Sequence, residues 1–282
     1  MYNVQSKEGG FKGTMENVGI KDESCLPHKH ISLLGKEIHF YRELTSTNSI
    51  ARQMAISGAP EGTIVMSRSQ SAGRGRMQRQ WYCPPGKGLL LSMVLRPEIN
   101  VQFIPQLTLL TAVVVAETIK IVTGCAAGIK WPNDIFINDK KVCGILAETS
   151  FSRANVEYVI IGLGINVNLG TNHLPSDCQE TSTSLSLELG QRVSRIKLLK
   201  QFIISWDEHI QGFVKAGHPY LRSKWIENNV TLGKRVSVNK GNYCIHGLAV
   251  DVSEKGGLIV RLSDGSLQEY LAEDVSLRKK LF

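Results

Sequence analysis

The sequence predicts an α+β fold in two parts, a larger region of mixed strands and helices followed by a small β-barrel. Strand-like and helix-like runs alternate in the first part. The longest apolar run, residues 107–122, is too long for a strand and is predicted to be a core helix. From Thr231 onward the pattern changes to short apolar runs separated by glycine turns, which is typical of a barrel of about 50 residues.

The first predicted helix begins at Thr47, whose hydroxyl can cap it, and runs to about Ser57 with Ile50 on its apolar face. Residues 62–67 and 88–95 then read as two strands. The segment between these strands is long, basic and rich in turn-forming residues, so it is predicted to be a loop.

A β-hairpin is predicted for residues 134–149, with Lys141 near its start. Pro132 ends the short apolar strand before it and fixes a turn, which presents Asn133 and Asp134 at the edge of the sheet. An Asn-Asp pair between two apolar runs supplies the turn of the hairpin.

The rest of the chain supplies one more strand, one helix and the barrel. A buried strand at residues 159–161 is predicted to end in glycines, which let a ligand approach the backbone. A polar loop at 171–184, an amphipathic helix at 196–215 and a boundary region at 219–229 follow. The barrel strands are predicted at residues 235–238, 246–251, 258–262 and 267–270.

The composition excludes several classes of protein. The 282 residues are 42% hydrophobic with a mean hydropathy of −0.07, and no apolar run approaches the ~20 residues that span a bilayer. Residues 1–30 are polar and lack the apolar core of a signal peptide. The six cysteines are scattered without a C-x-x-C pair, which indicates reduced thiols and argues against a zinc site.

Basic residues dominate the charge of the chain. The net charge of +8 and the pI of about 9.2 suit polyanionic ligands, but they do not distinguish ATP from nucleic acid or an acidic protein. The densest group is in Gln70-Ser-Ala-Gly-Arg-Gly-Arg-Met-Gln-Arg-Gln-Trp81, which places Arg74, Arg76 and Arg79 within six positions, with Gly73 and Gly75 among them. Arginine forks bind phosphate and carboxylate oxygens, and glycine allows close backbone approach, so this is a candidate anion-binding loop.

Five short stretches follow one another along the chain. They are Ser46-Thr-Asn48, the Gly-Arg-Gly-Arg loop ending in Trp81, Lys130-Trp-Pro-Asn-Asp134 with Lys141 and Gly144, Gly162-Leu-Gly-Ile-Asn166, and Asp274-Val-Ser-Leu-Arg278. In this order they resemble the biotin protein ligases, also called biotin–acetyl-CoA-carboxylase ligases. The resemblance covers roughly residues 38–280. Each motif alone is weak, but the ordered set is specific.

The resemblance implies a domain organisation. Residues 38–228 would form a catalytic biotin- and ATP-binding domain with the mixed sheet and flanking helices of class II synthetases, and residues 229–282 an SH3-like domain. Residues 1–37 are expected to be a flexible extension, because they lack helical periodicity and are too few for the winged helix-turn-helix of some members. We therefore expect a form without an N-terminal DNA-binding domain, and DNA binding is disfavoured.

The implied activity has two half-reactions. The carboxylate of biotin attacks the α-phosphorus of ATP, giving biotinyl-5′-AMP and pyrophosphate, and a lysine of a carrier domain then attacks the mixed anhydride. Negative charge gathers at the α-phosphate in both steps, so the catalytic residues implied are Lys141, Arg74 and Arg76. Lys140 is expected to be solvated, because adjacent strand residues face opposite sides. The arginine loop is expected to be disordered until an anion arrives and then to close over the phosphates.

The residues that match the family's substrate sites fall into two groups. The biotin-binding positions are Ser46, Thr47, Asn48, Gln70, Gly73, Arg74, Gly75, Arg76, Lys141, Gly144 and Gly162. The ATP-binding positions are Arg76, Arg79, Trp81, Lys130, Asn133, Asn166 and Arg278, with Asp134 as a possible Mg²⁺ contact. Trp81 would either cover the adenine or anchor the loop end, and Arg278 would either reach the nucleotide or lie on the surface. Gln78 stands where the family usually has glycine, which bears on the flexibility of the loop.

Other functions stay open at this point. A lipoate or octanoate ligase shares the fold, but those relatives carry a glycine-serine stretch in place of the arginine loop. A nucleic-acid-binding protein would interleave aromatic and basic residues along one face, whereas aromatics make up only 7% of this chain. A catalytically inactive relative is a third alternative, although the candidate site residues are all present. The expected setting is the cytoplasm, with biotin, ATP and Mg²⁺, a carboxylase carrier domain as partner, a possible homodimer and no membrane.

Overall fold

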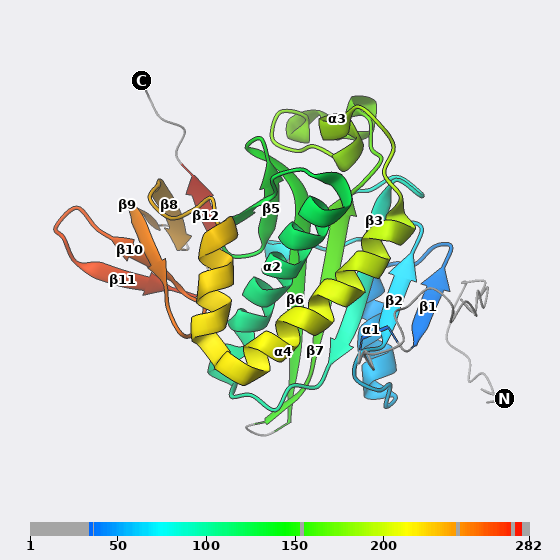
Figure 1. Ribbon diagram of the computed structural model, residues 1–282, viewed down its shortest axis with the longest axis horizontal. Helices are drawn as coiled ribbons and strands as arrows, with labels where there is room; N and C mark the ends of the chain where they lie inside the picture. Colours follow the sequence, from blue (N-terminus) through cyan, green and yellow to red (C-terminus); the bar gives the residue numbers. More distant parts are fainter. Residues whose placement is uncertain (1–33, 36, 153–154, 241–242, 272–273, 278–282) are drawn as a thin grey trace.

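The protein folds into a large and a small β-sheet joined by a long helix (Figure 1). This computed structural model describes residues 34–35, 37–152, 155–240, 243–271 and 274–277. The larger sheet has strand order β1-β2-β3-β7-β6-β5-β4, and the smaller has strand order β11-β10-β9-β8-β12. The predicted α+β class with a small C-terminal β domain is confirmed.

The larger sheet is mixed, because β1 pairs with β2 in parallel while the other described neighbours are antiparallel. Its strands are β1 Ile38–Tyr41, β2 Ile64–Ser67, β3 Gly88–Leu95, β4 Gly128–Lys130, β5 Asp134–Ile137, β6 Lys140–Ser152 and β7 Asn155–Asn166. The prediction that a strand ends at residue 161 was wrong. The glycines after it lie inside β7, since β3 and β6 both pair with that stretch.

Strand β3 is buried on both faces, which explains its continuous apolar run. Leu89, Leu91 and Met93 point into the main core. Leu90 belongs to a separate small cluster on the opposite face. Ser92 shares that opposite face and is the polar residue of an otherwise apolar strand. The opposite face is where the functional cavity lies.

Helix α2 (Ile104–Thr123) follows the 3-10 turn η3 (Val101–Phe103) and lies with α4 over one face of the large sheet (Figure 1). Within the described residues, Val101–Thr123 is long and apolar enough to cross a membrane, so the expectation that no run approaches that length was wrong. However, 67% of its most apolar window is buried inside the protein. Its contacts with α4, β4, β5 and β6 make it the core helix of this domain.

Helix α4 (Arg195–Asn228) is longer than predicted and has two arms. Gly217 interrupts it with φ 62° and ψ −147°, a conformation that favours glycine. Pro219 falls in the first turn after the interruption, where a missing N–H is tolerated, so the helix resumes. The region predicted as a boundary is therefore helical, and it carries the buried Leu221 and Trp225 to the small sheet.

Helix α1 (Thr47–Ile56) covers part of the opposite face of the large sheet, close to β2, β3 and β7. Ile50 and Ala51 pack there in a separate core cluster. A short helix, α3 (Leu185–Leu189), lies at one end of the sheet, away from α1 (Figure 1). These placements leave the cavity face open next to the start of α1.

The small sheet is antiparallel and is held firmly against the large domain. Its strands are β8 Arg235–Lys240, β9 Tyr243–Val252, β10 Leu258–Arg261, β11 Leu267–Tyr270 and β12 Asp274–Leu277. In the described sheet, β11 and β12 are not neighbours. Arg222 of α4 donates to both carboxylate oxygens of Asp251, at 3.0 and 2.8 Å, and the Trp131 indole donates to Gly256 O at 3.0 Å. One hydrophobic core crosses the predicted boundary at residue 229.

Candidate active site

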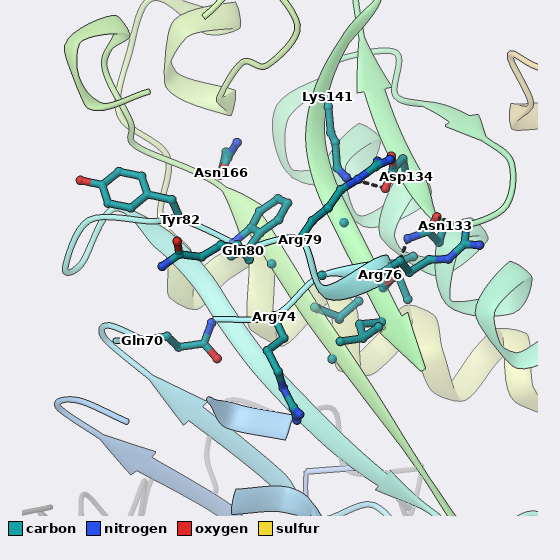
Figure 2. Close-up of a pocket in the computed structure, with 18 of the residues that line it drawn as sticks. Gln70, Arg74, Arg76, Arg79, Gln80, Tyr82, Asn133, Asp134, Lys141 and Asn166 are labelled. Carbon is teal, nitrogen blue, oxygen red and sulfur yellow. Dashed lines mark hydrogen bonds and ion pairs between the residues drawn. The ribbon is translucent and has the colours of Figure 1, made fainter. Parts of the chain in front are cut away.

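A cavity of about 260 Å³ lies over β6 and β7, on the face opposite α2 and α4. The loop that follows Gly73 lines it (Figure 2). The wall segment, residues 174–182, also lines it, through Leu174, Pro175, Cys178 and Ser182. Among the described residues, its charged lining side chains are Arg74, Arg76, Arg79, Lys141 and Asp134. An excess of cations in a concave site favours an anionic ligand.

Two cross-strand glycines clear the floor at one end of the cavity. Gly144 of β6 is directly opposite Gly164 of β7, and the Trp81 ring lies over both. A Cβ at Gly164 would come within 2.4 Å of that ring, and one at Gly144 within 3.0 Å. Glycine at these positions lets the indole lie against the sheet, so Trp81 anchors the end of the arginine loop. Its role toward adenine stays a prediction.

The other end of the cavity is a polar slot built around Asn48. Its Oδ1 accepts a hydrogen bond from Ser92 Oγ at 2.6 Å, and its Nδ2 donates to Glu148 Oε2 at 3.0 Å. A Cβ at Gly162 would lie 2.0 Å from Asn48 Oδ1, so glycine is required for this contact. With both ends of the amide engaged, Asn48 is fixed in one orientation.

Gln70 holds the beginning of α1 beside this slot. Its Oε1 accepts hydrogen bonds from Thr47 N at 2.7 Å and from Thr47 Oγ1 at 3.1 Å. The N-cap residue is Ser46, which makes no side-chain capping bond, so the prediction that Thr47 is the cap was wrong. A side chain from another segment satisfies an N–H that the helix leaves unpaired.

Backbone hydrogen bonds close the base of the arginine loop. Trp81 N donates to Gly73 O at 2.9 Å, and Gly75 N donates to Arg79 O at 2.7 Å. A Cβ at Gly73 would lie 2.5 Å from Trp81 O, which explains the glycine at that position. The loop is thus a closed hairpin in this structure, and disorder of the ligand-free loop stays a prediction.

The arginines of this loop point to different ends of the cavity. Arg76 Nη1 donates to Asn133 Oδ1 at 3.0 Å. Arg74 Nη2 instead lies 3.2 Å from Glu148 Oε2, beside the polar slot. Figure 2 shows Arg74 directed away from Arg76 and Arg79. Closure of all the arginines over a phosphate therefore requires Arg74 to leave Glu148.

A β-bulge directs Lys141 into the cavity. In the pairing of β5 with β6, the register skips Val142. Lys141 and Gly144 are three positions apart, so a regular strand would place them on opposite faces, but the bulge brings both to the cavity. Lys141 Nζ lies 2.7 Å from Asp134 Oδ1 and 5.5 Å from the centroid of the Trp81 ring.

Two buried polar atoms of the cavity residues have neither a hydrogen-bond partner nor a counter-charge within the described chain. They are Asn166 Oδ1 and Trp81 Nε1. Asn166 Nδ2 donates a hydrogen bond to Thr183 O at 3.0 Å, and Asn166 Oδ1 is left to accept one from a ligand. The carboxylate of Asp134 is paired, because Lys141 Nζ lies 2.7 Å from its Oδ1. Because unpaired buried polar groups cost about 1–3 kcal/mol each, the two unpaired atoms favour a polar ligand.

The structure brings together most of the residues that the sequence predicted for the site. Those lining the cavity are Ser46, Thr47, Asn48, Gln70, Arg74, Gly75, Arg76, Arg79, Trp81, Asn133, Asp134, Lys141, Gly144, Gly162 and Asn166. Gly73 is at the loop base and does not line it. Lys130 does not line it either, because it lies on the edge strand β4 with its ammonium 5.3 Å from the Phe136 ring centroid. Arg278 lies outside the described residues.

Sequence reasoning missed part of the lining. The residues not singled out are Met77, Gln80, Tyr82, Ile145, Leu146, Leu163, Gly164, Leu174, Pro175, Cys178 and Ser182. Two signals were readable, namely the period-two glycines of β7 and the lone serine at position 92 in an apolar strand. The polar loop at 171–184 gave no such signal. It contains the short turns η4 (Thr171–His173) and η5 (Ser176–Cys178) and supplies one wall.

The arrangement suits a ligand with two chemically different ends. The slot around Asn48 offers fixed amide and hydroxyl groups on a floor cleared by glycine, which matches a neutral polar ring. The opposite end holds Lys141 and Arg76, which match an anionic centre. Groups preorganised in this way can stabilise charge that develops between the two ends.

Two family models match this chain, the Biotin/lipoate A/B protein ligase family over residues 40–166 and the Biotin protein ligase C terminal domain over residues 231–278. The Bifunctional ligase/repressor BirA of Bacillus subtilis is 33% identical over 272 residues, covering 96% of this chain and 81% of that protein. The chain belongs to the biotin protein ligase family. The Biotin--[acetyl-CoA-carboxylase] ligase of Paracoccus denitrificans is 31% identical, covering 77% of this chain and 90% of that one.

Solved biotin protein ligases share the fold. The enzyme from Aquifex aeolicus in complex with biotin and ATP has a TM-score of 0.73 and 29% identity, covering 87% of this chain and all of that chain. The Leishmania major enzyme in complex with biotinyl-5-AMP has a TM-score of 0.59 at 23% identity, covering 83% of this chain and 98% of that one. The second likeness supports the fold alone.

Gln78 lies in the arginine loop with a backbone conformation that is rare for residues other than glycine. The 3-10 turn η2 (Arg76–Gln78) places Met77 and Gln78 at φ 53° and 59°, in the left-handed region. For a residue with a Cβ, this conformation costs about 1–2 kcal/mol. Glycine would remove that cost. However, its more flexible backbone would raise the entropic cost of ordering the loop by about 0.5–1 kcal/mol.

The Gln78→Gly variant is expected to hold its loop closed more firmly than wild type, because relief of the left-handed strain outweighs the added entropy. Trypsin cuts after arginine, so cleavage at Arg76 and Arg79 should slow about two- to fivefold. Gln80→Gly is the matched control, since Gln80 does not have a positive φ and glycine there only adds entropy. Faster cleavage in Gln78→Gly than in wild type would contradict this account.

Proposed function

We propose that this protein makes biotinyl-5′-AMP from biotin and ATP and transfers biotin to a lysine of a biotin carboxyl carrier domain. The observation that carries the proposal is the cavity with a neutral polar slot at one end and Lys141 and Arg76 at the other. Biotin has a neutral ureido ring and a carboxylate, so its ring matches the slot and its carboxylate matches the cations. The Aquifex aeolicus relative, which binds biotin and ATP, supports the same choice of ligands.

In the first half-reaction, a carboxylate oxygen of biotin forms a bond to the α-phosphorus as the bond to pyrophosphate breaks. Lys141 bridges the carboxylate and the α-phosphate in this proposal, which lowers their repulsion and stabilises the charge that gathers there. Arg76 holds the phosphate with its guanidinium group, which also donates a hydrogen bond from Nη1 to Asn133 Oδ1 at 3.0 Å. Asn166 and Trp81 offer an unpaired acceptor and an unpaired donor to the nucleotide.

In the second half-reaction, the amine of the carrier lysine attacks the carbonyl carbon of the mixed anhydride. AMP leaves with the bonding electrons and the attacking nitrogen loses a proton. Lys141 and Arg76 stabilise the leaving phosphate, which is the group that they already hold. The arginine loop keeps the reactive anhydride away from water and other amines until the carrier arrives.

Magnesium fits the site through Asp134. Its carboxylate lines the cavity, and Mg²⁺ is commonly held by one or two carboxylates together with substrate phosphates. No cluster of three or more metal-binding side chains occurs among the described residues, so the phosphates of ATP must supply further ligands. Bound Mg²⁺ would neutralise charge on the leaving pyrophosphate.

Biotin-dependent exchange of labelled pyrophosphate into ATP tests the proposal. The pure protein is expected to catalyse this exchange with biotin and MgATP, and to show at most a trace with lipoate or octanoate, because the glycine-cleared slot and the arginine loop match biotin. Chelation of Mg²⁺ with EDTA should abolish the exchange. Exchange with lipoate but not with biotin would favour the alternative ligase. Absence of exchange with any acid, in folded protein, would refute the function.

The partner and the compartment belong to the same proposal. The Paracoccus denitrificans relative is a Biotin--[acetyl-CoA-carboxylase] ligase, which supports the carrier domain of a carboxylase as the macromolecular substrate. The five described cysteines are free, which supports the cytoplasm as the compartment. Burial raises the pKa of Cys83 to about 12, so that thiol is not a nucleophile at neutral pH. A homodimer, the absence of a membrane and the absence of DNA binding remain predictions.

A further inference from the structure

Glu188 lies outside the cavity, yet its carboxylate contacts both segments that flank Lys141. Its Oε2 accepts a hydrogen bond from Asn138 Nδ2 at 2.6 Å, and its Oε1 accepts one from Thr183 Oγ1 at 2.5 Å. Asn138 is in the turn that joins β5 to β6, whereas Thr183 directly follows the wall segment. One side chain on the short helix α3 therefore ties these two segments together.

The wall segment is paired with the backbone of Lys141 itself. Lys141 N donates to Thr181 O at 2.8 Å, and Thr183 N donates to Lys141 O at 2.9 Å. This pairing is an isolated parallel bridge between Lys141 and Ser182. Because both backbone groups of Lys141 are engaged by this short stretch, its position fixes the peptide plane and hence the direction of the lysine side chain.

The other side of Lys141 depends on the hairpin turn. Asn138 and Asp139 have φ of 50° and 59°, so the turn places two side-chain-bearing residues in the left-handed region. Lys141 is the second residue of β6 and stands next to the bulge at Val142. Lys141 pairs with Phe136 of β5 at the edge of that bulge, and the pairing of β6 with β7 begins only at Cys143. A shift of the turn or of the wall segment would therefore move the ammonium.

We propose that Glu188 is a positioning residue for Lys141, acting through Asn138 and Thr183 without contact with substrate. The inference rests on the proposed function, because it requires Lys141 to act between the biotin carboxylate and the α-phosphate. Reactions of this kind are sensitive to displacements of about 1 Å. The carboxylate is suited to the task because both of its partners are donors and it can only accept.

Substitution of Glu188 should slow catalysis without weakening biotin binding. In pyrophosphate exchange, Glu188→Ala is expected to lower kcat about tenfold, while KM for biotin stays within about twofold, because the Asn48 slot is at the other end of the cavity. Glu188→Gln should recover most of kcat. Its amide oxygen can accept from Asn138, and its amide nitrogen can donate to the Thr183 hydroxyl, which can also accept. Loss of kcat in Glu188→Gln equal to that in Glu188→Ala would contradict positioning by these contacts.

A double-mutant cycle with Lys141→Ala separates positioning from a general effect on the fold. If Glu188 acts through Lys141, the double variant should have the same kcat as Lys141→Ala alone, since the positioned group is already gone. A further tenfold loss in the double variant would overturn the inference. A lowered melting temperature with kcat unchanged would also overturn it.

Two more variants keep the test decisive. Thr183→Val removes one hydroxyl at constant size and should lower kcat in the same direction even if Glu188→Ala folds poorly. Glu98→Ala removes an exposed carboxylate outside the wall segment and the cavity, and should leave kcat unchanged. If wild type shows no exchange, the proposed function fails. If wild type is active and both Glu188→Ala and Thr183→Val keep full kcat, the positioning role fails.

Discussion

Replacing Lys141 with alanine is expected to lower the rate of adenylate formation about 100-fold or more, the scale on which one preorganised charge-stabilising group acts. The substitution removes the ammonium that lies 2.7 Å from Asp134 and leaves that carboxylate without its counter-charge. The measurement is single-turnover formation of biotinyl-5′-AMP with saturating biotin and MgATP. Biotin affinity, measured without ATP, should fall much less than the rate, because the polar slot is intact.

Lys140→Ala is the matched control for this experiment. Lys140 is the neighbouring residue of the same strand and is exposed, whereas Lys141 faces the cavity. The control should form adenylate at the wild-type rate within about twofold, since exposed substitutions have small effects. Equal losses in the two variants would contradict the assignment of Lys141 as the bridging cation.

The second large effect is expected from Arg76→Gly, which should release activated biotin into solution. Arg76 stands in the loop over the cavity and its fork can hold the phosphate, so its loss removes a contact of about 1.5–3 kcal/mol. Glycine also loosens a loop that already contains Gly73 and Gly75. Escape of the mixed anhydride should therefore accelerate more than its formation slows.

A bystander protein with exposed lysines and no carrier fold reports this escape. Incubated with the variant, biotin and MgATP, it should become biotinylated more than with wild type when the data are normalised to adenylate produced. The Lys140→Ala variant should label it no more than wild type does. Equal bystander labelling by Arg76→Gly and wild type would rule out a retention role for Arg76.

Much of the architecture was readable from local patterns. The strand at residues 88–95, the hairpin with its Asn138-Asp139 turn and the core helix of α2 follow from apolar periodicity and turn chemistry, which are properties of adjacent residues. The limits of α4 were not readable, because a proline usually ends a helix. Here Gly217 absorbs the interruption and lets the chain start a second arm.

The sequence by itself determined the chemical inventory of the site. Residue types and short spacings define the arginine loop, the Lys-Trp-Pro-Asn-Asp stretch and the period-two glycines. The order of these stretches along the chain indicated one family. The tertiary structure decided how these groups meet. A bulge turns Lys141 into the cavity, Glu148 draws Arg74 away from Arg76, and an unmarked loop forms one wall. Those outcomes depend on strand register and on contacts between residues far apart in the chain. Local periodicity carries no information about either.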